Sequence, residues 1–410
     1  MSFIRRWAAP MLVAVGMLST ASCTTDTGGT PKAWINVTSA GNEFVGSEKC
    51  QKCHEDEYKT WKASWHAKMV RTPKDALLKD AGENWAKDAK GNAGPTKGNV
   101  TGAPFRMDDV QYVIGSHWKQ RYLVKNSVTG NLQFMDKQWN TVHKQWEPYG
   151  QKNDWESNCA TCHATGYKLT SYDPANPATQ KASMVEHNTG CESCHGPGAR
   201  HSVTKKAADV FNPKNASVDQ ASMVCGYCHV RKENYNFKTA QNHPREDQPH
   251  PVLGETFKAG QDDWRKWYPE KMLIPGVGAD QPLSRNYPNT DLNNAFFIDE
   301  KAQAWKSHDA RKHHQEYQEY IQSTHYTKNK AACHDCHSPH FVEGRKQMTA
   351  QAQCDSCHKD VRYEIDKIMP GLGSTAANLF LRSHTFNAKQ DRKGGPTATG
   401  MPEPAYFYKR

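Results

Sequence analysis

The 410-residue sequence contains little apolar material for its length. Only 36% of its residues are hydrophobic, and the mean hydropathy is −0.88. This composition is poor for a chain of such size if its own side chains must form the whole core. After residue 18, no segment is apolar enough to span a bilayer. We therefore expect membrane contact through an anchor alone, and an interior partly built from something other than side chains.

Cysteine is almost absent outside one repeated pattern, Cys-x-x-Cys-His, which occurs six times. Two thiols three positions apart can each add to one vinyl group of a haem, and the next histidine then lies under the iron. The pattern therefore predicts six covalently attached c-type haems. The predicted thioether cysteines are Cys50, Cys53, Cys159, Cys162, Cys191, Cys194, Cys225, Cys228, Cys333, Cys336, Cys354 and Cys357. The predicted proximal iron ligands are His54, His163, His195, His229, His337 and His358.

Other uses of paired cysteines fit this sequence poorly. A zinc ribbon joins two such motifs across a fixed gap and needs no histidine after each. A thioredoxin-like redox site needs one motif inside a βαβ unit, and no such pattern surrounds these motifs. A disulfide framework suits a short secreted domain rather than a chain of 410 residues. Haem attachment is the interpretation that explains all six copies, and haems would supply the missing apolar surface.

The net charge of +10 does not indicate nucleic-acid binding. Arg5 and Arg6 would be lost with a signal peptide, and six haems would bring twelve propionates. We expect the lysines and arginines to pair with propionates or to face solvent, and we expect no nucleic-acid partner.

The N-terminus has the features of an export signal. Arg5 and Arg6 precede a short apolar segment, and small residues then lead to Cys23. This order resembles a bacterial lipoprotein signal, in which the cysteine becomes the lipidated N-terminus. Thr20 stands where leucine is usual, which leaves an ordinary cleaved signal as the alternative. The chain is expected to be exported, as an outer membrane lipoprotein that is periplasmic or exposed at the cell surface, and Thr24 after the cysteine favours the outer membrane.

We expect four segments: a signal peptide (1–22), a flexible tether (23–43), a haem-bearing body (44–388) and a Gly/Pro/aromatic tail (389–410). The body is predicted to be mainly α, with extensive loops and a small β-hairpin.

Periodicity places the elements within the body. Helices are predicted around Glu55–Met69 and over Asp299–Lys328. The hairpin is predicted from the alternating segments Val110–Ile114 and Gln120–Lys125, followed by a turn into Leu132–Met135. The Lys/Gly/Asn-rich residues 88–102 are expected to form an exposed loop.

Several segments point to one family. They are Phe44–Cys50, Gly115–Leu123, Gly190–His201, His314–Gln318, Cys336–His340 and Arg382–Phe386. From about Phe44 to Phe386 the sequence resembles multihaem cytochromes of the cytochrome c-554 and hydroxylamine oxidoreductase clan. The resemblance implies a haem-packed fold. Several of those relatives are secreted or outer-surface electron conduits, and some assemble as filaments.

The second axial ligand decides whether each iron is closed or open for chemistry. Fourteen histidines lie outside the motifs. The resemblance implies His66, His201, His325, His340 and His384 as second ligands. His117, His143, His313 and His314 compete for the sixth position, and Met69 and Met107 are the methionine alternatives. The surplus histidines are expected to be ordinary surface or core residues.

The leading hypothesis is long-range electron transfer through bis-histidine haems, in extracytoplasmic or extracellular respiration and without catalytic residues. The alternative is a nitrite, hydroxylamine or tetrathionate reductase with one open haem, for which His243, His250 or Tyr287 would line a pocket. The Cys-x-x-Cys-Lys motif of many nitrite reductases is absent from the sequence. A third hypothesis is a structural or binding lipoprotein that haem stabilises.

The expected partners are redox cytochromes or extracellular electron acceptors. Head-to-tail contact between copies of the chain would extend the haem chain into a filament, and a monomeric shuttle is the alternative.

Overall fold

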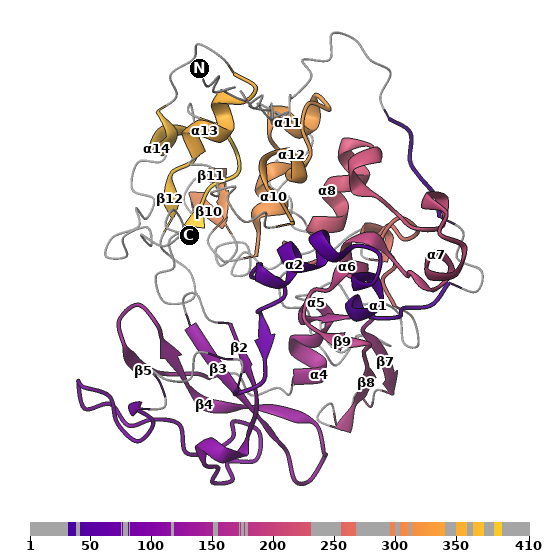
Figure 1. Ribbon diagram of the computed structural model, residues 1–410. Helices are drawn as coiled ribbons and strands as arrows, with labels where there is room; N and C mark the ends of the chain where they lie inside the picture. Colours follow the sequence, from indigo (N-terminus) through magenta and orange to yellow (C-terminus); the bar gives the residue numbers. More distant parts are fainter. Residues whose placement is uncertain are drawn as a thin grey trace, which may run out of the picture.

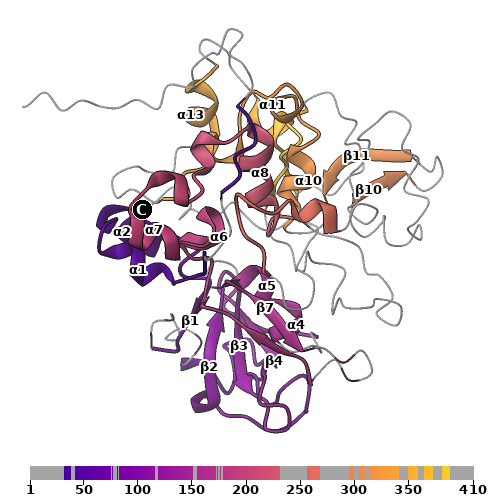
Figure 2. The same ribbon diagram turned by 90° about the vertical axis from the view of Figure 1, so that its right-hand side faces the viewer.

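The computed structural model describes residues 32–37, 42–74, 76, 81, 83–115, 119–150, 155–171, 173, 176, 179–230, 256–267, 296–299, 304–310, 314–340, 350–358, 364–372 and 381–387. The export signal with Cys23 and the tail 389–410 lie outside these residues. So do His117, His243, His250, Tyr287 and His313. A sheet region and a helical region make up the described chain, and the sheet lies below the helices in Figures 1 and 2.

A five-stranded antiparallel sheet forms the lower region. Its strands are β1 (Val70–Arg71), β2 (Val110–Ile114), β3 (Lys119–Lys125), β4 (Leu132–Asn140) and β5 (Gln145–Pro148). Each strand pairs with the next one in chain order, so the sheet is a meander. Its strands are rich in valine, tyrosine, phenylalanine and tryptophan, the side chains that a pleated and partly buried surface favours.

Alternation along the central strand buries both faces of this sheet. Tyr122 packs on one face with Trp139 and Trp146, whereas Leu123 packs on the other with Trp155. The turn between β3 and β4 is the predicted one. The Asn126 side chain accepts hydrogen bonds from the N–H groups of Val128 and Thr129, at 2.8 and 3.1 Å, and Gly130 adopts a left-handed φ of 74°.

The segment 88–102, which was expected to be an exposed loop, packs in part against the sheet. Isolated bridges join Lys87 to Ala93 and Gly98 to Met135. Asp88 is buried and accepts a hydrogen bond from the Trp146 N–H at 2.8 Å. The polar composition of the segment therefore serves backbone turns and side-chain hydrogen bonds as well as solvent contact.

The helices are short, and the longest in the described residues have nine residues. They are α1 (Ser47–Gln51), α2 (Glu55–Ala63), α4 (Trp155–Asn158), α5 (Ala160–His163), α6 (Cys191–His195), α7 (Ala199–Thr204), α8 (Val218–Gly226), α10 (Glu316–Tyr320), α11 (Thr324–Thr327), α12 (Cys333–Cys336), α13 (Ala350–Asp355) and α14 (Ile365–Ile368). Four small two-stranded sheets lie among them. Their strands are β6 (Ala164–Thr165), β7 (Lys168–Ser171), β8 (Lys181–Ser183), β9 (Glu186–His187), β10 (Phe296–Asp299), β11 (Ala304–Ala310), β12 (Gly371–Leu372) and β13 (Leu381–Arg382).

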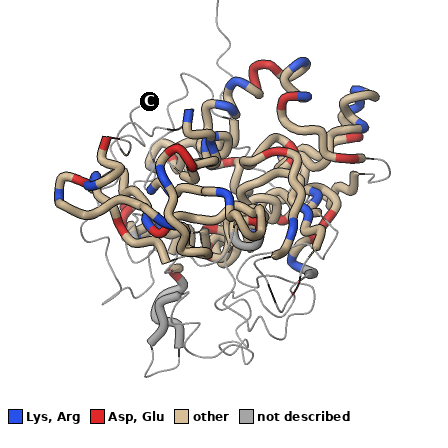
Figure 3. Tube along the Cα trace, turned by 90° about the horizontal axis from the view of Figure 1, so that it is seen from below, with Lys and Arg blue, Asp and Glu red and all other residues tan. Residues whose placement is uncertain are grey.

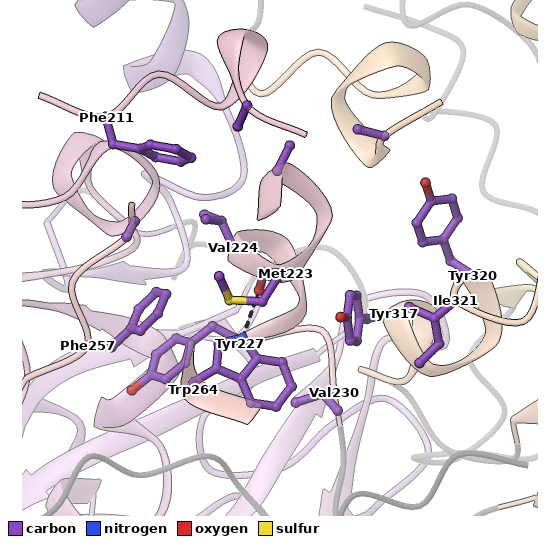
Figure 4. Close-up of a cluster of buried hydrophobic side chains, with 14 of the residues drawn as sticks. Phe211, Met223, Val224, Tyr227, Val230, Phe257, Trp264, Tyr317, Tyr320 and Ile321 are labelled. Atoms are coloured by element: carbon purple, nitrogen blue, oxygen red, sulfur yellow. Dashed lines mark hydrogen bonds between the residues drawn. The ribbon is translucent and has the colours of Figure 1, made fainter. Parts of the chain in front are cut away.

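One hydrophobic cluster holds the helical region together (Figure 4). It gathers Met223 and Val224 of α8 with Tyr317 and Tyr320 of α10 and with Trp264. The Trp264 Nε1–H donates to the Met223 carbonyl at 2.8 Å, so this buried indole is satisfied. The cluster fixes α8 against α10 and thereby places the segments on either side of both helices.

The prediction of a mainly α body with a small hairpin is not supported, since the described residues combine short helices with a five-stranded sheet. The helix predicted over Asp299–Lys328 is also wrong. That range contains strand β11, which pairs with β10, and then the separate helices α10 and α11. The spaced large residues that suggested a helix are partly placed by tertiary packing, because Tyr317 and Tyr320 belong to the central cluster.

Basic and acidic residues are interleaved along the described trace, as the view from below shows (Figure 3). Among the described helices, none has the length and apolarity needed to cross a membrane.

Replacing Gly94 by alanine is expected to destabilise the sheet region by about 1–3 kcal/mol, the usual range for overpacking. A Cβ at this position would lie 1.6 Å from the Trp85 carbonyl oxygen and 3.2 Å from Trp146 Nε1. The matched control is Gly150→Ala, whose added Cβ meets no described atom within 4 Å. Thermal unfolding followed by tryptophan fluorescence compares the two variants, and equal midpoints would show that the packing of residues 83–98 against the sheet is incorrect.

Candidate haem-binding sites

Each Cys-x-x-Cys-His motif forms one tight helical turn. In five motifs the histidine N–H donates to the carbonyl of the first cysteine, four positions earlier, at 2.8–3.0 Å. The remaining motif, Cys191–His195, is itself helix α6. Residues three apart on a helical turn lie on the same face, so the two thiols of a motif point to the same side. This is the local geometry that attachment to the two vinyl groups of one haem requires.

The two thiols of a motif are not joined to each other in a disulfide. In the first five motifs both cysteines are free, and Cys354 of the sixth motif is free as well. Cys53 and Cys336 are exposed, although they belong to the helical region that surrounds the motifs. A planar apolar group attached at these positions would cover them.

Every motif histidine faces a second imidazole. The distances between ring centres are 6.1 Å for His54 and His201, 6.4 Å for His163 and His314, 6.1 Å for His195 and His340, 6.4 Å for His229 and His66, 6.0 Å for His337 and His384, and 6.0 Å for His358 and His325. The six distances are nearly equal although the partners come from unrelated segments. A shared physical requirement is the simplest reason for such uniformity.

Haem iron fits this spacing. A metal bonds an imidazole nitrogen at about 2 Å, and the ring centre lies about 1.2 Å further, so the centres of two rings on opposite sides of one iron are about 6.4 Å apart. His229 supplies a second test: its side chain is 42% exposed although imidazoles and a carboxylate surround it. Part of this ring is therefore accessible to a bound macrocycle. The residues present fit the group that the motifs predict.

His314 lies between two motif histidines. Its ring centre is 6.4 Å from that of His163 and 6.2 Å from that of His229. His66 also faces His229, at 6.4 Å. Only the combination of His66 with His229 and His314 with His163 gives each motif histidine its own partner. His314 has a left-handed φ of 61°, an unfavourable conformation that is often retained at functional positions.

The other candidates for the sixth position lie elsewhere or outside the described chain. His143 is exposed in the turn between β4 and β5, where its Nδ1 is 3.5 Å from the Asn140 amide nitrogen. His117 lies in the connection from β2 to β3, which the structure does not describe. Met107 is 38% exposed at the start of the 3₁₀ turn Met107–Asp109. Of the described histidine candidates for this position, His314 alone is brought to a motif histidine.

Burial favours the neutral form of most of these imidazoles, which is the form that binds a metal. It lowers the pKa of His66, His163 and His337 to about 4 in each case. His229 differs. Loss of water around the part of its ring that packs against the protein also opposes its protonation, but a 3.0 Å hydrogen bond between its Nδ1 and the Glu316 carboxylate outweighs this effect and raises the pKa to about 9.

Cysteines of different motifs lie next to one another. The Cys50 thiol is hydrogen-bonded to Cys191, the Cys225 thiol to Cys333, and the Cys228 thiol to Cys162. Cys194 also lies near Cys228, with both packed against the central cluster, and Cys336 lies near Cys354. Thioether sulfurs are attached at the edge of the macrocycle, so neighbouring sulfurs from two motifs imply neighbouring haem edges.

Glu192 is a structural residue of these sites that sequence reasoning missed. It lies between the two cysteines of the third motif and is 2% exposed. Its carboxylate accepts hydrogen bonds from the N–H groups of Val45 and Gly46, just before the first motif, and of Gly198, at 2.7–3.0 Å. Burial raises its pKa, and these three donors partly offset the shift. The only sequence signal was an acidic residue inside a motif.

A second contact connects the same two motifs. The Ser47 hydroxyl donates to Glu186 at 2.6 Å and accepts from the Cys191 N–H at 2.9 Å. Together with Glu192, it fixes helix α1 beside helix α6, which explains why Cys50 and Cys191 meet.

Repeated Cys-x-x-Cys-His turns with paired imidazoles define a multihaem c-type cytochrome, which binds haem covalently. The matching family model is described as cytochrome c554 and c-prime. It matches residues 49–110 and 116–196, which contain the first three motifs. The chain is thus a multihaem c-type cytochrome with a cytochrome c554 pattern in its N-terminal part.

Three known proteins are similar to the chain. The solved outer cell wall cytochrome OcwA is 18% identical, with a TM-score of 0.53, over 87% of this chain and 83% of that one. The undecahaem cytochrome from the S-layer of Carboxydothermus ferrireducens is 21% identical, with a TM-score of 0.41, over 80% of this chain and 44% of that one. Dissimilatory sulfite reductase MccA of Wolinella succinogenes is 21% identical in a 386-position alignment that covers 77% of this chain. The chain spans about half the length of this curated relative. The similarity to OcwA shows a shared fold.

Replacing Glu192 by alanine is expected to destabilise the protein by about 3 kcal/mol or more, because one buried and two half-buried N–H groups lose their acceptor. The matched control is Glu48→Ala on the exposed side of α1, which should change stability by less than about 0.5 kcal/mol. Thermal unfolding of the haem-loaded protein measures both. Equal midpoints would contradict the role of Glu192 in joining the first and third motifs.

Proposed function

We propose that the chain carries six covalently attached haems, each held by two histidines, and transfers electrons over a long distance. Bound haem would supply a one-electron couple, ferric to ferrous. The motif cysteines would attach each haem, and the two imidazoles would hold its iron six-coordinate in both oxidation states. The observation that carries this proposal is the second imidazole opposite each of the six motif histidines, at 6.0–6.4 Å.

The proposed second ligands are His201, His314, His340, His66, His384 and His325, in the order of the motifs that they serve. This set contains the five histidines that the family resemblance implied, with His314 in the sixth position. It leaves His143 as an ordinary surface residue.

Contacts between cysteines support an order for the sites in space. We number the sites by their motifs along the chain. Site 1 adjoins site 3 through Cys50 and Cys191, and site 4 adjoins site 5 through Cys225 and Cys333. The proximity of Cys194 to Cys228 and of Cys336 to Cys354 supports placing site 3 beside site 4 and site 5 beside site 6. The proposed chain is therefore 1–3–4–5–6.

Site 2 joins this chain as a branch. Its Cys162 is hydrogen-bonded to Cys228 of site 4, and His314 lies between His163 and His229. Site 4 is consequently the junction at which sites 2, 3 and 5 meet.

A reductase is the alternative function, and the similarity to a sulfite reductase at 21% identity supports it. Such an enzyme needs one iron with an open face. Pairing of all six motif histidines favours the electron carrier. The pocket proposed around His243, His250 and Tyr287 lies outside the described residues.

The proposed location is outside the cytoplasm, with a lipid anchor at Cys23. Export follows from the chemistry of the N-terminal sequence, and the similar OcwA is an outer cell wall cytochrome. The proposed partners are other redox cytochromes or extracellular acceptors. Assembly into a filament through the tail 389–410 stays a prediction.

The purified protein is expected to contain six haems per chain, all low-spin. Two imidazoles on every iron leave no site for a weak-field ligand. Haem content is measured by the pyridine haemochrome method and mass spectrometry, and spin state by electron paramagnetic resonance. Addition of nitrite, sulfite or cyanide should leave the spectra unchanged. A high-spin fraction near one haem in six that binds these anions would instead support the reductase.

Replacing His201 by methionine is expected to raise one reduction potential by on the order of 0.1 V, since methionine–histidine ligation gives higher potentials than two histidines. Attachment should persist, because Cys50, Cys53 and His54 are unchanged. The matched control is His143→Met in the exposed turn. A spectroelectrochemical titration identical to that of the control would remove His201 from the proposed ligands.

A further inference from the structure

The second ring nitrogen has a different environment in each of three motif histidines, His163, His195 and His229. His195 Nδ1–H donates to the backbone carbonyl of Phe211 at 2.8 Å. The Nδ1 atom of His163 is buried without a hydrogen-bond partner. In His229 the same atom is 3.0 Å from a carboxylate oxygen of Glu316. The Nδ1 atom therefore has no hydrogen-bond partner in His163, a neutral carbonyl partner in His195 and a negatively charged carboxylate partner in His229.

Two packed helices, α8 and α10, place Glu316 beside His229. It is the first residue of helix α10, whose Tyr317 and Tyr320 are fixed in the central cluster against α8. Helix α8 ends at Gly226, just before His229, and the Tyr317 N–H donates to the His229 carbonyl at 3.0 Å. The same pair of packed helices therefore positions both the Glu316 carboxylate and the His229 imidazole, so the fold itself determines their contact.

We propose that Glu316 is a positioning residue that lowers the reduction potential of site 4, the junction of the proposed haem chain. This inference rests on the proposed function. A carboxylate that accepts the Nδ1 hydrogen bond makes the imidazole a stronger donor to the metal at its other nitrogen. It also places a negative charge near the iron, which stabilises the ferric state over the ferrous state. No proton transfer is needed for either effect.

Because site 4 is the junction of the proposed haem series, its interaction with Glu316 would affect electron transfer along the whole series. Sites 1 and 3 connect to sites 5 and 6 only through site 4 in the order proposed above. An electron that crosses between these two groups must occupy site 4 briefly. Glu316 therefore raises the energy of that intermediate step and limits exchange between the two ends, while site 2 exchanges with the rest through the same junction.

The test is Glu316→Gln in the intact, haem-loaded protein. Glutamine keeps an oxygen acceptor for the Nδ1–H but removes the charge, as at His195, where a neutral carbonyl is the acceptor. We expect one of the six one-electron components to shift at least about tenfold toward the reduced form at a fixed potential, which is about 59 mV for a one-electron couple. Glu316→Ala, which also removes the acceptor, should shift the same component further.

Two additional variants make the result specific. The matched control is Glu57→Gln on α2, an exposed carboxylate that acts on His340 through space without a hydrogen bond, so it should leave the shifted component in place. His66→Met changes the proposed second ligand of the same iron. The component that moves in Glu316→Gln should be the one that moves in His66→Met, as titrations followed by electron paramagnetic resonance determine.

The outcomes separate this inference from the proposed function. A titration of Glu316→Gln that matches the wild type, with six low-spin haems, overturns the role of Glu316 and leaves the electron carrier intact. A loss of one haem would show that Glu316 serves attachment or folding, which also overturns it. High-spin haem in the wild-type protein would count against the six-coordinate chain itself, whatever Glu316 does.

Discussion

The opposed imidazole pair is the interaction on which the rest of the structure depends. Each of the six pairs joins segments that are separated in the sequence, such as His54 with His201 and His195 with His340. With an iron between the rings, as proposed above, each pair would be a cross-link between distant parts of the chain. Such links explain how short helices and a low hydrophobic content are compatible with a defined fold, because the side chains form only three local hydrophobic clusters in the described residues.

The local chemistry of these sites was predictable from the sequence, since attachment depends on spacing within five residues. The second ligands were less accessible. His314 and His143 were both candidates, and although His314 lies in a segment that carries the family resemblance, the sequence did not decide between them. The structure separates them because His314, which follows strand β11, is half-buried beside His163 and His229, whereas His143 lies in an exposed turn. Long-range contacts of this kind leave no periodic signal in a single sequence.

The same distinction explains the errors in the fold. The alternating segments around Val110–Lys125 were recognised as strands, but the sheet also includes β1 and β5, which are too short to show alternation. The range Asp299–Lys328 suggested one helix because its large residues are spaced at helical intervals. Those residues are instead divided between a strand and two helical turns, and Tyr317 is buried by contact with α8 and Trp264. Tertiary packing, rather than local preference, determined these elements.

Carboxylates show how such a fold combines structure with electron transfer. Glu192 joins the first and third motifs through backbone N–H groups alone. On one turn of α10, Glu319 accepts the N–H of His384 at 2.7 Å, while Glu316 contacts the ring of His229. Glu319 therefore positions the His384 imidazole, whereas Glu316 places a negative charge beside the His229 imidazole. Helix α10 thus contacts site 4 through Glu316 and site 5 through Glu319. Its packing against α8 therefore fixes the geometry of both sites together with the charge beside His229.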